Sequence, residues 1–322
     1  MKLEYYTSSN HNPHFNLALE KHLMETCPEA TLRFYLWQNE HTVVIGKNQS
    51  AQSEVHLAKL KEDKGTLARR SSGGGAVYHD LGNLNFTFIG DDSVFDIPKQ
   101  MQVIAQALCD LGYNAQVNGR NDIEVDGAKV SGNAFAHQAG MHLHHGTLLV
   151  NVDKAKLGLY LNANPKKLKR KNVASVVARI ANLSEIKAIT IDALKTHLFN
   201  TMEKVYQVRA RFCNIPFSFD PQLVEAFSNE TWLYNLHRNE KVVFSECFDF
   251  GCVEWQMDVQ NGVIRDNHLY TDAMDTEWSR KIENCVIGIE ASEIELTKAL
   301  RRFDDPNVDE LIRALHDQGI TV

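Results

Sequence analysis

Residues 69–80 read RRSSGGGAVYHD, and this stretch carries the most information about the fold and its site. Three consecutive glycines lack side chains, so the backbone N–H groups of the turn can approach an anion closely. Arg69 and Arg70 add permanently charged donors suited to phosphate or carboxylate, and a strand follows from Ala76 to Tyr78. The stretch matches neither a Walker loop nor a dinucleotide fingerprint. It predicts an anion-binding turn; the alternative is an ordinary glycine-rich turn with two solvated arginines.

A second polar stretch, residues 119–134, reads GRNDIEVDGAKVSGNA. Lys129 lies in an expected strand between glycine-containing turns, where its ammonium group can place one compact charge over a phosphate. The alternative is a solvated lysine beside a hairpin turn, which is the commoner environment of lysine. Asn121 and Asp122 offer the oxygen ligands that Mg²⁺ prefers, and the same two residues are equally typical of a turn.

A third stretch, residues 142–149, reads HLHHGTLL and brings three histidines together. On a strand, His142 and His144 lie on one face and His145 on the other. No Cys or Glu stands nearby at the spacing of metal ligands. We therefore expect strand histidines beside a ligand pocket rather than a metal site.

The segments around these stretches have the periodicity of short strands and helices. Residues 84–88 alternate apolar and polar side chains, the period of a half-buried strand. Apolar residues from Met101 to Leu111 recur at helical spacing, and Gly112 follows where a helix-ending glycine belongs. Further strands are expected at 32–37, 42–45, 122–125, 129–131 and 145–152, and further helices at 15–24 and 192–206. Without regular strand–helix alternation, we expect an α+β fold: a mixed, mainly antiparallel sheet flanked by helices.

The last part of the chain differs in pattern and in charge. Residues 253–259 alternate apolar and polar side chains and lead to Asn261-Gly262, a hairpin turn signal. Amphipathic segments follow at about 294–303 and 308–316. Residues 246–322 hold 17 acidic and 7 basic residues, whereas the rest of the chain is slightly basic. We therefore expect two domains, a catalytic one over 1–242 and a small α+β domain over 243–322.

The composition of the 322 residues argues against several classes of protein. With 43% hydrophobic and 23% charged residues, the chain is typical of a soluble globular protein. Its acidic part would repel a nucleic-acid backbone, so no nucleic-acid partner is expected. No apolar run reaches membrane-spanning length and no secretory signal opens the chain, so we expect a cytoplasmic protein without a membrane partner. The six scattered cysteines predict reduced thiols rather than a disulfide framework.

The three stretches occur in an order and at spacings that resemble the lipoate–protein ligase A family, within the biotin/lipoate protein ligase superfamily. The motifs that carry the resemblance are RRxSGGGAVYHDLGNxN at 69–85, GRND at 119–122, GxKxSG at 127–132 and HHGTLL at 144–149. NLALE at 16–20 and TVVIGKNQ at 42–49 also match, and residues 165–179 resemble the family's adenylate-binding loop. The acidic tail, with Trp255 and its hairpin, resembles the family's small accessory domain, so the resemblance covers nearly the whole chain.

The resemblance implies an enzyme that uses ATP and Mg²⁺ to convert lipoate into lipoyl-AMP and pyrophosphate. The lipoyl group would then pass to a lysine of apo lipoyl domains, those of 2-oxo acid dehydrogenases and of the glycine cleavage carrier protein. The resemblance makes Lys129 the catalytic residue and Asp122 a Mg²⁺ ligand through phosphate. The implied ATP and lipoyl-AMP ligands are Arg70, Gly75, Ala76, Val77, Tyr78, Asn121, Asp122 and Lys129. The implied lipoate pocket consists of Gly74, His79, Lys129, His145 and Gly146.

The basic run KKLKRK at 166–171 is the densest positive segment of the chain. We interpret it as a mobile flap that covers the adenylate and shields it from water, the gating role of many lids. The alternative is a solvated basic loop.

Other functions fit the sequence less well. An octanoyltransferase needs a cysteine nucleophile near the pocket, and no cysteine lies between Cys109 and Cys213. A biotin ligase shares the fold and typically lacks these motifs. A lipoyltransferase restricted to preformed lipoyl-adenylate and a non-catalytic lipoate-binding paralogue stay as alternatives, with Arg70 and Lys129 favouring the enzyme. A monomer is expected, and the motifs leave open whether lipoate or octanoate is preferred.

Overall fold

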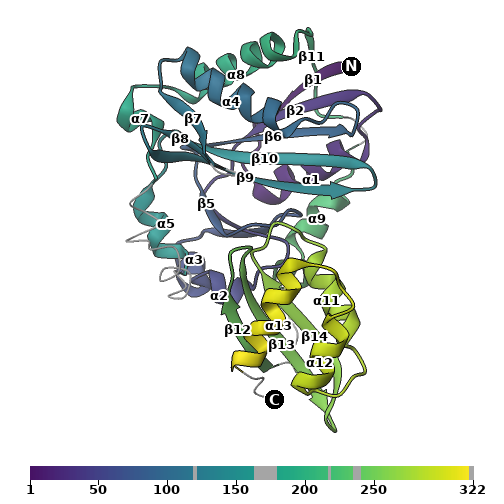
Figure 1. The fold of residues 1–322 in the computed structure, drawn as a ribbon. Helices are drawn as coiled ribbons and strands as arrows, with labels where there is room; N and C mark the ends of the chain where they lie inside the picture. The colour runs from purple at the N-terminus through teal and green to yellow at the C-terminus, as the bar shows by residue number, and fades with distance from the viewer. Residues whose placement is uncertain (119–121, 163–179, 217–218, 235–240, 319–322) are drawn as a thin grey trace.

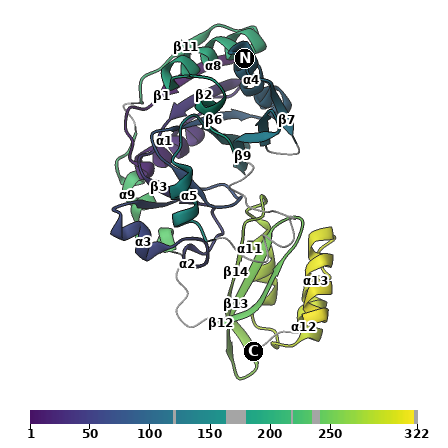
Figure 2. The same ribbon diagram turned by 90° about the vertical axis from the view of Figure 1, so that its left-hand side faces the viewer.

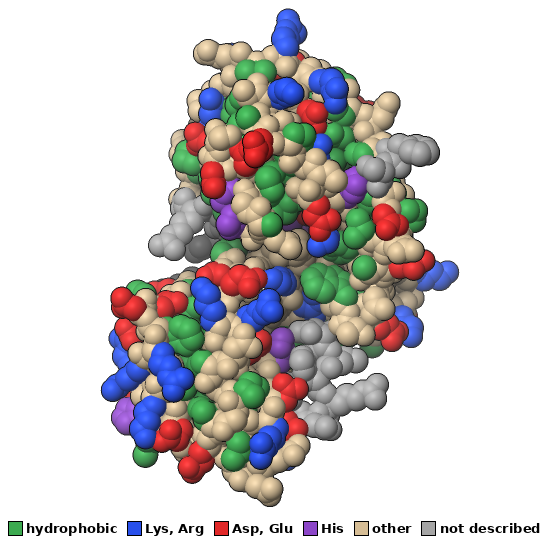
Figure 3. Space-filling model, turned by 90° about the vertical axis from the view of Figure 1, so that its right-hand side faces the viewer, with side chains coloured by type: hydrophobic (Ala, Val, Ile, Leu, Met, Phe, Trp, Pro, Cys, Tyr) green, Lys and Arg blue, Asp and Glu red, His purple; other side chains and the backbone are tan. Residues whose placement is uncertain are grey.

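The computed structural model describes residues 1–118, 122–162, 180–216, 219–234 and 241–318. Its elements form a large body around a long sheet and a small C-terminal body around a short one (Figure 1). The two bodies follow one another along the long axis of the molecule (Figure 2). The surface narrows where they meet, and acidic and basic side chains are interspersed on the face shown in Figure 3.

The strands of the large body are β1 (Lys2–Thr7), β2 (Thr31–Trp37), β3 (Thr42–Ile45), β4 (Thr66–Arg69), β5 (Val77–His79), β6 (Asn83–Asp91), β7 (Ala115–Asn118), β8 (Asp122–Val125), β9 (Ala128–Gln138), β10 (Met141–Leu149) and β11 (Ala210–Phe212). Its helices are α1 (Pro13–Glu25), α2 (Ala51–Glu54), α3 (Leu57–Glu62), α4 (Ile97–Asp110), α5 (Lys154–Tyr160), α7 (Leu183–Ile186), α8 (Ile191–Tyr206), α9 (Gln222–Ser228) and α10 (Glu230–Tyr234). The small body contains β12 (Lys241–Cys247), β13 (Cys252–Gln260), β14 (Val263–Thr271), α11 (Trp278–Val286), α12 (Glu293–Leu300) and α13 (Pro306–Gln318). None of the described helices combines the length and the apolar character that crossing a membrane requires.

The main sheet has eight strands in the order β11-β1-β2-β6-β10-β9-β8-β7. β1 runs parallel to β2 and to β11, and the other neighbouring pairs are antiparallel. β6 and β10 pair along their whole length, from Met141 opposite Asp91 to Leu149 opposite Asn83. The prediction of a mixed, mainly antiparallel sheet flanked by helices is confirmed.

Helices cover both faces of the main sheet. Because side chains alternate along β2, Phe34 faces a core shared with α4 and α8, whereas Tyr35 and Trp37 face the core beside α1. The N-terminus of α4 is capped by the Asp96 side chain, which accepts the N–H of Lys99. The helix ends before Gly112, whose φ of +87° is the left-handed conformation of a C-terminal glycine. The helix end predicted there is confirmed.

A second, smaller sheet in the order β4-β3-β5 carries the glycine-rich stretch. β3 runs parallel to β4 and antiparallel to β5. Its apolar residues pack against α2, α3 and α5 in a separate core that includes Val43, Leu67 and Tyr78. The turn between β4 and β5, residues 70–76, is called the glycine turn below, and both strands that hold it are anchored by this core.

The small body is an antiparallel meander of β12, β13 and β14 covered on one face by α11, α12 and α13 (Figures 1 and 2). Trp255 and Trp278 lie in the core between the sheet and the helices. β13 and β14 are joined at Asn261 and Gly262, with φ of +54° and +74°. Two successive left-handed residues are what a tight type I′ hairpin requires, so the predicted hairpin is confirmed.

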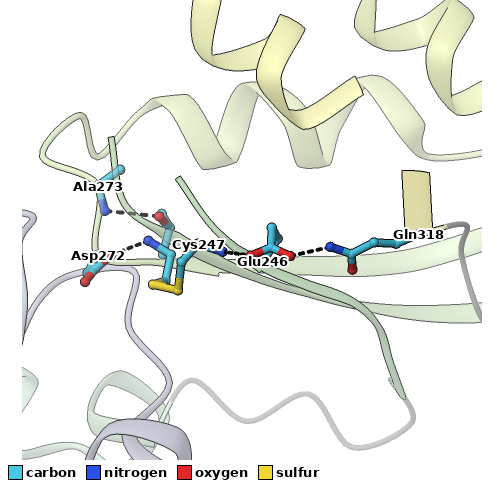
Figure 4. Close-up of a disulfide and its surroundings, with 7 residues drawn as sticks. Glu246, Cys247, Asp272, Ala273 and Gln318 are labelled. Carbon is cyan, nitrogen blue, oxygen red and sulfur yellow. Dashed lines mark hydrogen bonds between the residues drawn. A yellow bond between two sulfur atoms is a disulfide. The ribbon is translucent and has the colours of Figure 1, made fainter. Parts of the chain in front are cut away.

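A disulfide links Cys247 at the end of β12 to Cys252 at the start of β13 (Figure 4). The two residues lie opposite each other in the β12–β13 pairing. The prediction of reduced thiols is therefore wrong for this pair, while the other four cysteines are free. Cys247 and Cys252 do not form a C-x-x-C pattern. The pairing of β12 with β13 brings their two sulfur atoms together.

The small body contacts the glycine turn directly. The N–H of Gly74 donates to the carbonyl oxygen of Ala273 at 3.4 Å. Beside this contact, the side-chain amide of Asn48 donates to Ser279 Oγ at 2.9 Å, and Lys47 Nζ lies 2.8 Å from a carboxylate oxygen of Glu277. The C-terminal body is thus attached to the same turn that the sequence singles out as an anion site.

Candidate functional site

Arg70 organises the glycine turn from its buried side. Its guanidinium Nη2 donates to the carbonyl oxygens of Gly73 at 2.7 Å and of Gly75 at 2.8 Å. Gly74, between them, has φ of +87°, a conformation that favours glycine. Burial lowers the pKa of Arg70 to about 10, so the guanidinium stays charged at neutral pH. Arg70, which the sequence predicts as a ligand of an anion, therefore directs its Nη2 at the turn's own carbonyl groups.

Arg69 has a different role from its neighbour. Its side chain is 1% exposed, and its guanidinium donates to main-chain carbonyl groups of two separate segments. The acceptors are Gly46, Lys47, Gln49, Trp232 and Leu233. Arg69 thus fixes loops around the glycine turn instead of offering donors to a ligand.

The outer side of the glycine turn is open. A Cβ placed on Gly75 would meet no heavy atom within 4 Å. Among the described residues, none accepts a hydrogen bond from the N–H of Gly75 or of Ala76. Val77 and Tyr78 continue into β5 opposite β3, and the Tyr78 ring is buried beside His41 and Tyr160. The turn therefore has two backbone donors without an acceptor in the described chain, one at the exposed Gly75 and one at the half-buried Ala76, an arrangement suited to an anion site.

Lys129 and Asp122 lie on the neighbouring strands β9 and β8. Lys129 Nζ is 2.7 Å from Asp122 Oδ1, and both side chains are about one third exposed. The Lys129 side chain lies across Gly132, where a Cβ would come within 3.1 Å of Nζ. The Lys129 side chain is partly exposed although Asp122 Oδ1 itself is buried, so a ligand carboxylate or phosphate can reach the ammonium group and replace Asp122 as its partner.

His145 connects the main sheet to the glycine turn. Its Nδ1 lies 2.9 Å from Glu20 Oε1 and its Nε2 lies 2.6 Å from Ser72 Oγ. Gly146 follows it, and a Cβ there would come within 2.4 Å of the Phe86 ring and of Asn133 Oδ1. Gly146 is therefore needed for close packing of β10 against its neighbours.

His79, at the end of β5, is a buried neutral imidazole. Burial lowers its pKa to about 3, and the nearby charge of Arg70 acts in the same direction. The amide nitrogen of Asn39 donates to His79 Nδ1 at 3.2 Å, which places the ring hydrogen on Nε2. That Nε2 has no hydrogen-bond partner among the described residues.

The structure thus brings Arg70, Gly74, Gly75, His79 and His145 together around one turn. His142 and His144 lie on the other face of β10, as the alternation predicts: His144 is held by Gln100 and Asn133, and His142 by Asp92. In the described part of the chain, no group of three or more His, Cys, Asp or Glu side chains is arranged to hold a metal. Asn121 and the basic run 166–171 lie outside the described residues.

Sequence reasoning overlooked Glu20 and Ser72 as parts of the site. Glu20 is 1% exposed on α1, among the apolar residues that this helix buries. Its charged side chain, four residues after the equally buried Asn16, is the signal that marks a functional helix face. Met274 of the small body was not predicted to lie beside the turn either. Its Sδ would be 3.4 Å from a Cβ on Gly74.

Comparison with known proteins identifies the family to which the chain is similar. Residues 12–203 match the family model of the lipoyl protein ligase A/B catalytic domain, and residues 240–314 match that of the bacterial lipoate protein ligase C-terminus. The curated lipoate-protein ligase A of Bdellovibrio bacteriovorus is 38% identical over 284 residues, which cover 85% of this chain and 84% of that protein.

Solved structures show the same similarity. P. falciparum LipL1 in complex with lipoate has a TM-score of 0.86 at 29% identity, covering 98% of this chain and all of the other. The bi-partite lipoate protein ligase of Thermoplasma acidophilum, from a study that also includes its E2 lipoyl domain, has a TM-score of 0.65 at 27% identity, over 75% and 98%. Lipoate-protein ligase A bound with ATP has a TM-score of 0.63 at 26% identity, over 73% and 99%. On these matches and on its own motifs, the chain belongs to the lipoyl protein ligase A/B family.

Proposed function

We propose that this protein is an ATP-dependent lipoate–protein ligase. It converts lipoate and ATP into lipoyl-AMP and pyrophosphate, and it then transfers the lipoyl group to a lysine of an apo lipoyl domain. The observation that carries the proposal is the glycine turn, which Arg70 holds so that the N–H groups of Gly75 and Ala76 are open to a phosphate. The names of the relatives, and the lipoate and ATP in the titles of two similar structures, support it.

The first step joins two anions. A carboxylate oxygen of lipoate attacks the α-phosphorus of ATP, and pyrophosphate leaves. Positive charge and N–H donors placed around the α-phosphate lower the barrier, because negative charge on its oxygens grows in the transition state. Gly75 and Ala76 supply backbone donors. Lys129 supplies an ammonium group that leaves Asp122 and binds the reacting oxygens instead.

The second step is aminolysis of the mixed anhydride. The neutral ε-amine of the acceptor lysine attacks the lipoyl carbonyl carbon, AMP leaves, and the amine loses one proton. The same Lys129 ammonium group can hold the carbonyl oxygen as negative charge develops there. We propose that the acceptors are lipoyl domains of 2-oxo acid dehydrogenases and of the glycine cleavage carrier protein.

Mg²⁺ is part of the proposal as the partner of the ATP phosphates. When bound, Mg²⁺ would offset the negative charge of the ATP phosphates and so ease the departure of pyrophosphate. Asp122 fits such a role as one carboxylate, since Mg²⁺ keeps several waters and uses few protein ligands. We further propose that the protein works as a monomer in the cytoplasm.

Isotope exchange tests the activation step. Labelled pyrophosphate should enter ATP when lipoate and Mg²⁺ are present, and not when lipoate is omitted. Exchange without lipoate dependence would contradict the proposed substrate. No exchange, together with lipoyl transfer from synthetic lipoyl-AMP, would identify a transferase without activation. Neither reaction, with lipoate still bound, would identify a non-catalytic lipoate-binding protein.

A further inference from the structure

Arg70 is connected to a buried carboxylate by a chain of hydrogen bonds. Arg70 Nε lies 3.1 Å from Ser72 Oγ, Ser72 Oγ lies 2.6 Å from His145 Nε2, and His145 Nδ1 lies 2.9 Å from Glu20 Oε1. The four residues come from the glycine turn, which holds both Arg70 and Ser72, from β10 and from α1. Glu20 and His145 are 125 residues apart in sequence, so the chain depends on the tertiary fold.

A second chain ends at the same oxygen atom. Trp37 Nε1 donates to Thr87 Oγ1 at 3.0 Å, and Thr87 Oγ1 donates to Glu20 Oε1 at 2.7 Å. Both chains are buried; Glu20 is 1% exposed, and Ser72 and Thr87 are fully buried. Together, Arg70, Ser72, His145, Glu20, Thr87 and Trp37 are called the Glu20 network below.

The direction of the hydrogen bonds at the ends of the Glu20 network follows from the chemistry of the groups there. Arg70 and Trp37 can only donate, and an ionised carboxylate can only accept. Ser72 Oγ therefore accepts from Arg70, and the Nδ1–H of His145 donates to Glu20. The Ser72 hydroxyl has two neighbours, His145 Nε2 at 2.6 Å and the carbonyl oxygen of Gly73 at 3.5 Å. Thr87 likewise accepts from Trp37 and donates to Glu20. Every contact between Arg70 or Trp37 and Glu20 thus pairs a donor with an acceptor, as a stable buried network requires.

The network also balances charge. The Arg70 side chain is buried, and a buried guanidinium is stable when a carboxylate compensates it. The negative charge of Glu20 acts against the lowering of the Arg70 pKa by burial. Ser72 and His145 connect these opposite charges through hydrogen bonds, so Glu20 influences both the orientation and the ionisation of Arg70.

The consequence reaches the glycine turn. The same Arg70 group that depends on Glu20 binds the carbonyl oxygens of Gly73 and Gly75. These bonds set the conformation in which the N–H groups of Gly75 and Ala76 are open. A change at Glu20 is therefore transmitted to the donors that the proposed function assigns to the α-phosphate.

We propose that Glu20 is a positioning residue for lipoyl-AMP formation: it fixes the glycine turn through His145, Ser72 and Arg70 without touching the reacting atoms. This inference rests on the proposed function. The order Ser72–His145–Glu20 also matches that of an acyl-enzyme triad. Ser72 differs from a nucleophile, however, because its side chain is fully buried and its Oγ accepts a hydrogen bond from the Arg70 guanidinium.

The test compares two carboxylate-to-amide substitutions. Glu20→Gln keeps the shape and the accepting oxygen but removes the charge. The matched control is Glu4→Gln, because Glu4 is also buried and pairs with Arg33 at 3.0 Å, outside the network. Both variants are assayed for lipoate-dependent pyrophosphate exchange and for transfer from synthetic lipoyl-AMP to an apo lipoyl domain, each corrected for the folded fraction.

We expect Glu20→Gln to lower kcat for exchange by about tenfold or more, and transfer by less than about threefold. Glu4→Gln should leave both rates within about twofold of the wild type. Equal losses of exchange and transfer in Glu20→Gln would indicate a merely structural role and overturn the proposal. A wild-type exchange rate in Glu20→Gln, or a covalent lipoyl adduct on Ser72, would overturn it as well.

Amide hydrogen exchange separates this proposal from the proposed function. The amide hydrogens of the peptide covering residues 70–79 should exchange faster in Glu20→Gln than in the wild type, whatever the enzyme's activity. In Glu4→Gln their exchange rate should equal that of the wild type. An unchanged rate of amide hydrogen exchange in Glu20→Gln would refute the link between Glu20 and the turn. A wild type without lipoate-dependent pyrophosphate exchange would refute the function and leave this link measurable.

Discussion

Lys129 is the residue on which the proposed chemistry depends most. In the structure its charge is paired with Asp122 in a partly exposed ion pair, and such pairs contribute little to stability. The pair keeps the ammonium group near the strand without burying it. An incoming phosphate or carboxylate offers charged acceptor oxygens of the same kind as those of the aspartate, so exchange of partners costs little.

Lys129→Ala should therefore abolish activity and spare the fold. We expect lipoate-dependent pyrophosphate exchange to fall by at least about a hundredfold, since one charged group is lost from the transition state. The melting temperature should stay within a few degrees of the wild type. Lys154→Ala is the matched control, because Lys154 forms a similarly exposed pair with Glu185 at 2.8 Å. A large drop in melting temperature with Lys129→Ala would assign Lys129 a structural role instead.

Two glycines of the same turn allow a contrast. A Cβ on Gly75 meets no atom within 4 Å, whereas a Cβ on Gly73 would come within 2.4 Å of the Ala273 carbonyl oxygen. Gly75→Ala should keep the stability of the wild type and raise KM for ATP by about tenfold, because the methyl group occupies the open side of the turn. Gly73→Ala should lower the melting temperature by disturbing the contact with the small body. The reverse pattern would show that the open side of Gly75 is not used by ATP.

At the scale of the elements, strands β5 and β10 each bury a neutral histidine. Burial lowers the pKa of His79 and of His144 to about 3, against 6.5 for an unperturbed imidazole. Because the folded-state pKa is lowered, their contribution to stability is complete above pH 6.5. It is lost as the pH falls from 6.5 towards 3, where the unfolded chain binds protons that the folded chain does not.

Stability should therefore decrease below pH 6.5, by about 1.4 kcal/mol per pH unit for each such histidine. Urea unfolding at pH 7.5, 6 and 5 measures this. His144→Gln lowers stability at all three values but should reduce the loss between pH 7.5 and 5 relative to the wild type. Equal losses in the two proteins would mean that His144 binds a proton in the folded state.

The disulfide of the β12–β13 hairpin also acts at the scale of single elements. Cys252 donates its N–H to Asp272 Oδ1, so the bridge is joined to the segment that precedes Ala273 (Figure 4). Closing a short loop in the unfolded chain stabilises the fold by about 2 kcal/mol. Reductant should lower the unfolding free energy of the wild type to that of the Cys247→Ser, Cys252→Ser double variant, and leave the variant unchanged. Insensitivity of the wild type to reductant would contradict a stabilising bridge.

Local signals allowed several elements to be predicted from the sequence. The end of α4 at Gly112 and the hairpin at Asn261-Gly262 depend on residues next to each other, and both are confirmed. α2 and α3 were not predicted, because they are short and their apolar residues show no extended helical period. The disulfide was not predicted, because it depends on the register of two strands.

For the whole molecule, the order of the sheet and the assembly of the site required the structure. β1 pairs with β11, which brings Leu3 opposite Ala210, and no local pattern specifies such a pairing. The glycine turn itself was predicted from its own residues, since its chemistry is local. Glu20 was not, because its role arises only when α1, β10 and the turn meet in the folded chain.

The two bodies of the molecule meet at the glycine turn, so the proposed activity is tested on the entire chain. The most direct test is the intact mass of an apo lipoyl domain after incubation with the full-length protein, lipoate and Mg·ATP. The account predicts a gain equal to one lipoyl group that disappears when ATP is omitted or when Lys129→Ala replaces the wild type. A lipoyl domain of unchanged mass, with both ATP and synthetic lipoyl-AMP, would contradict it.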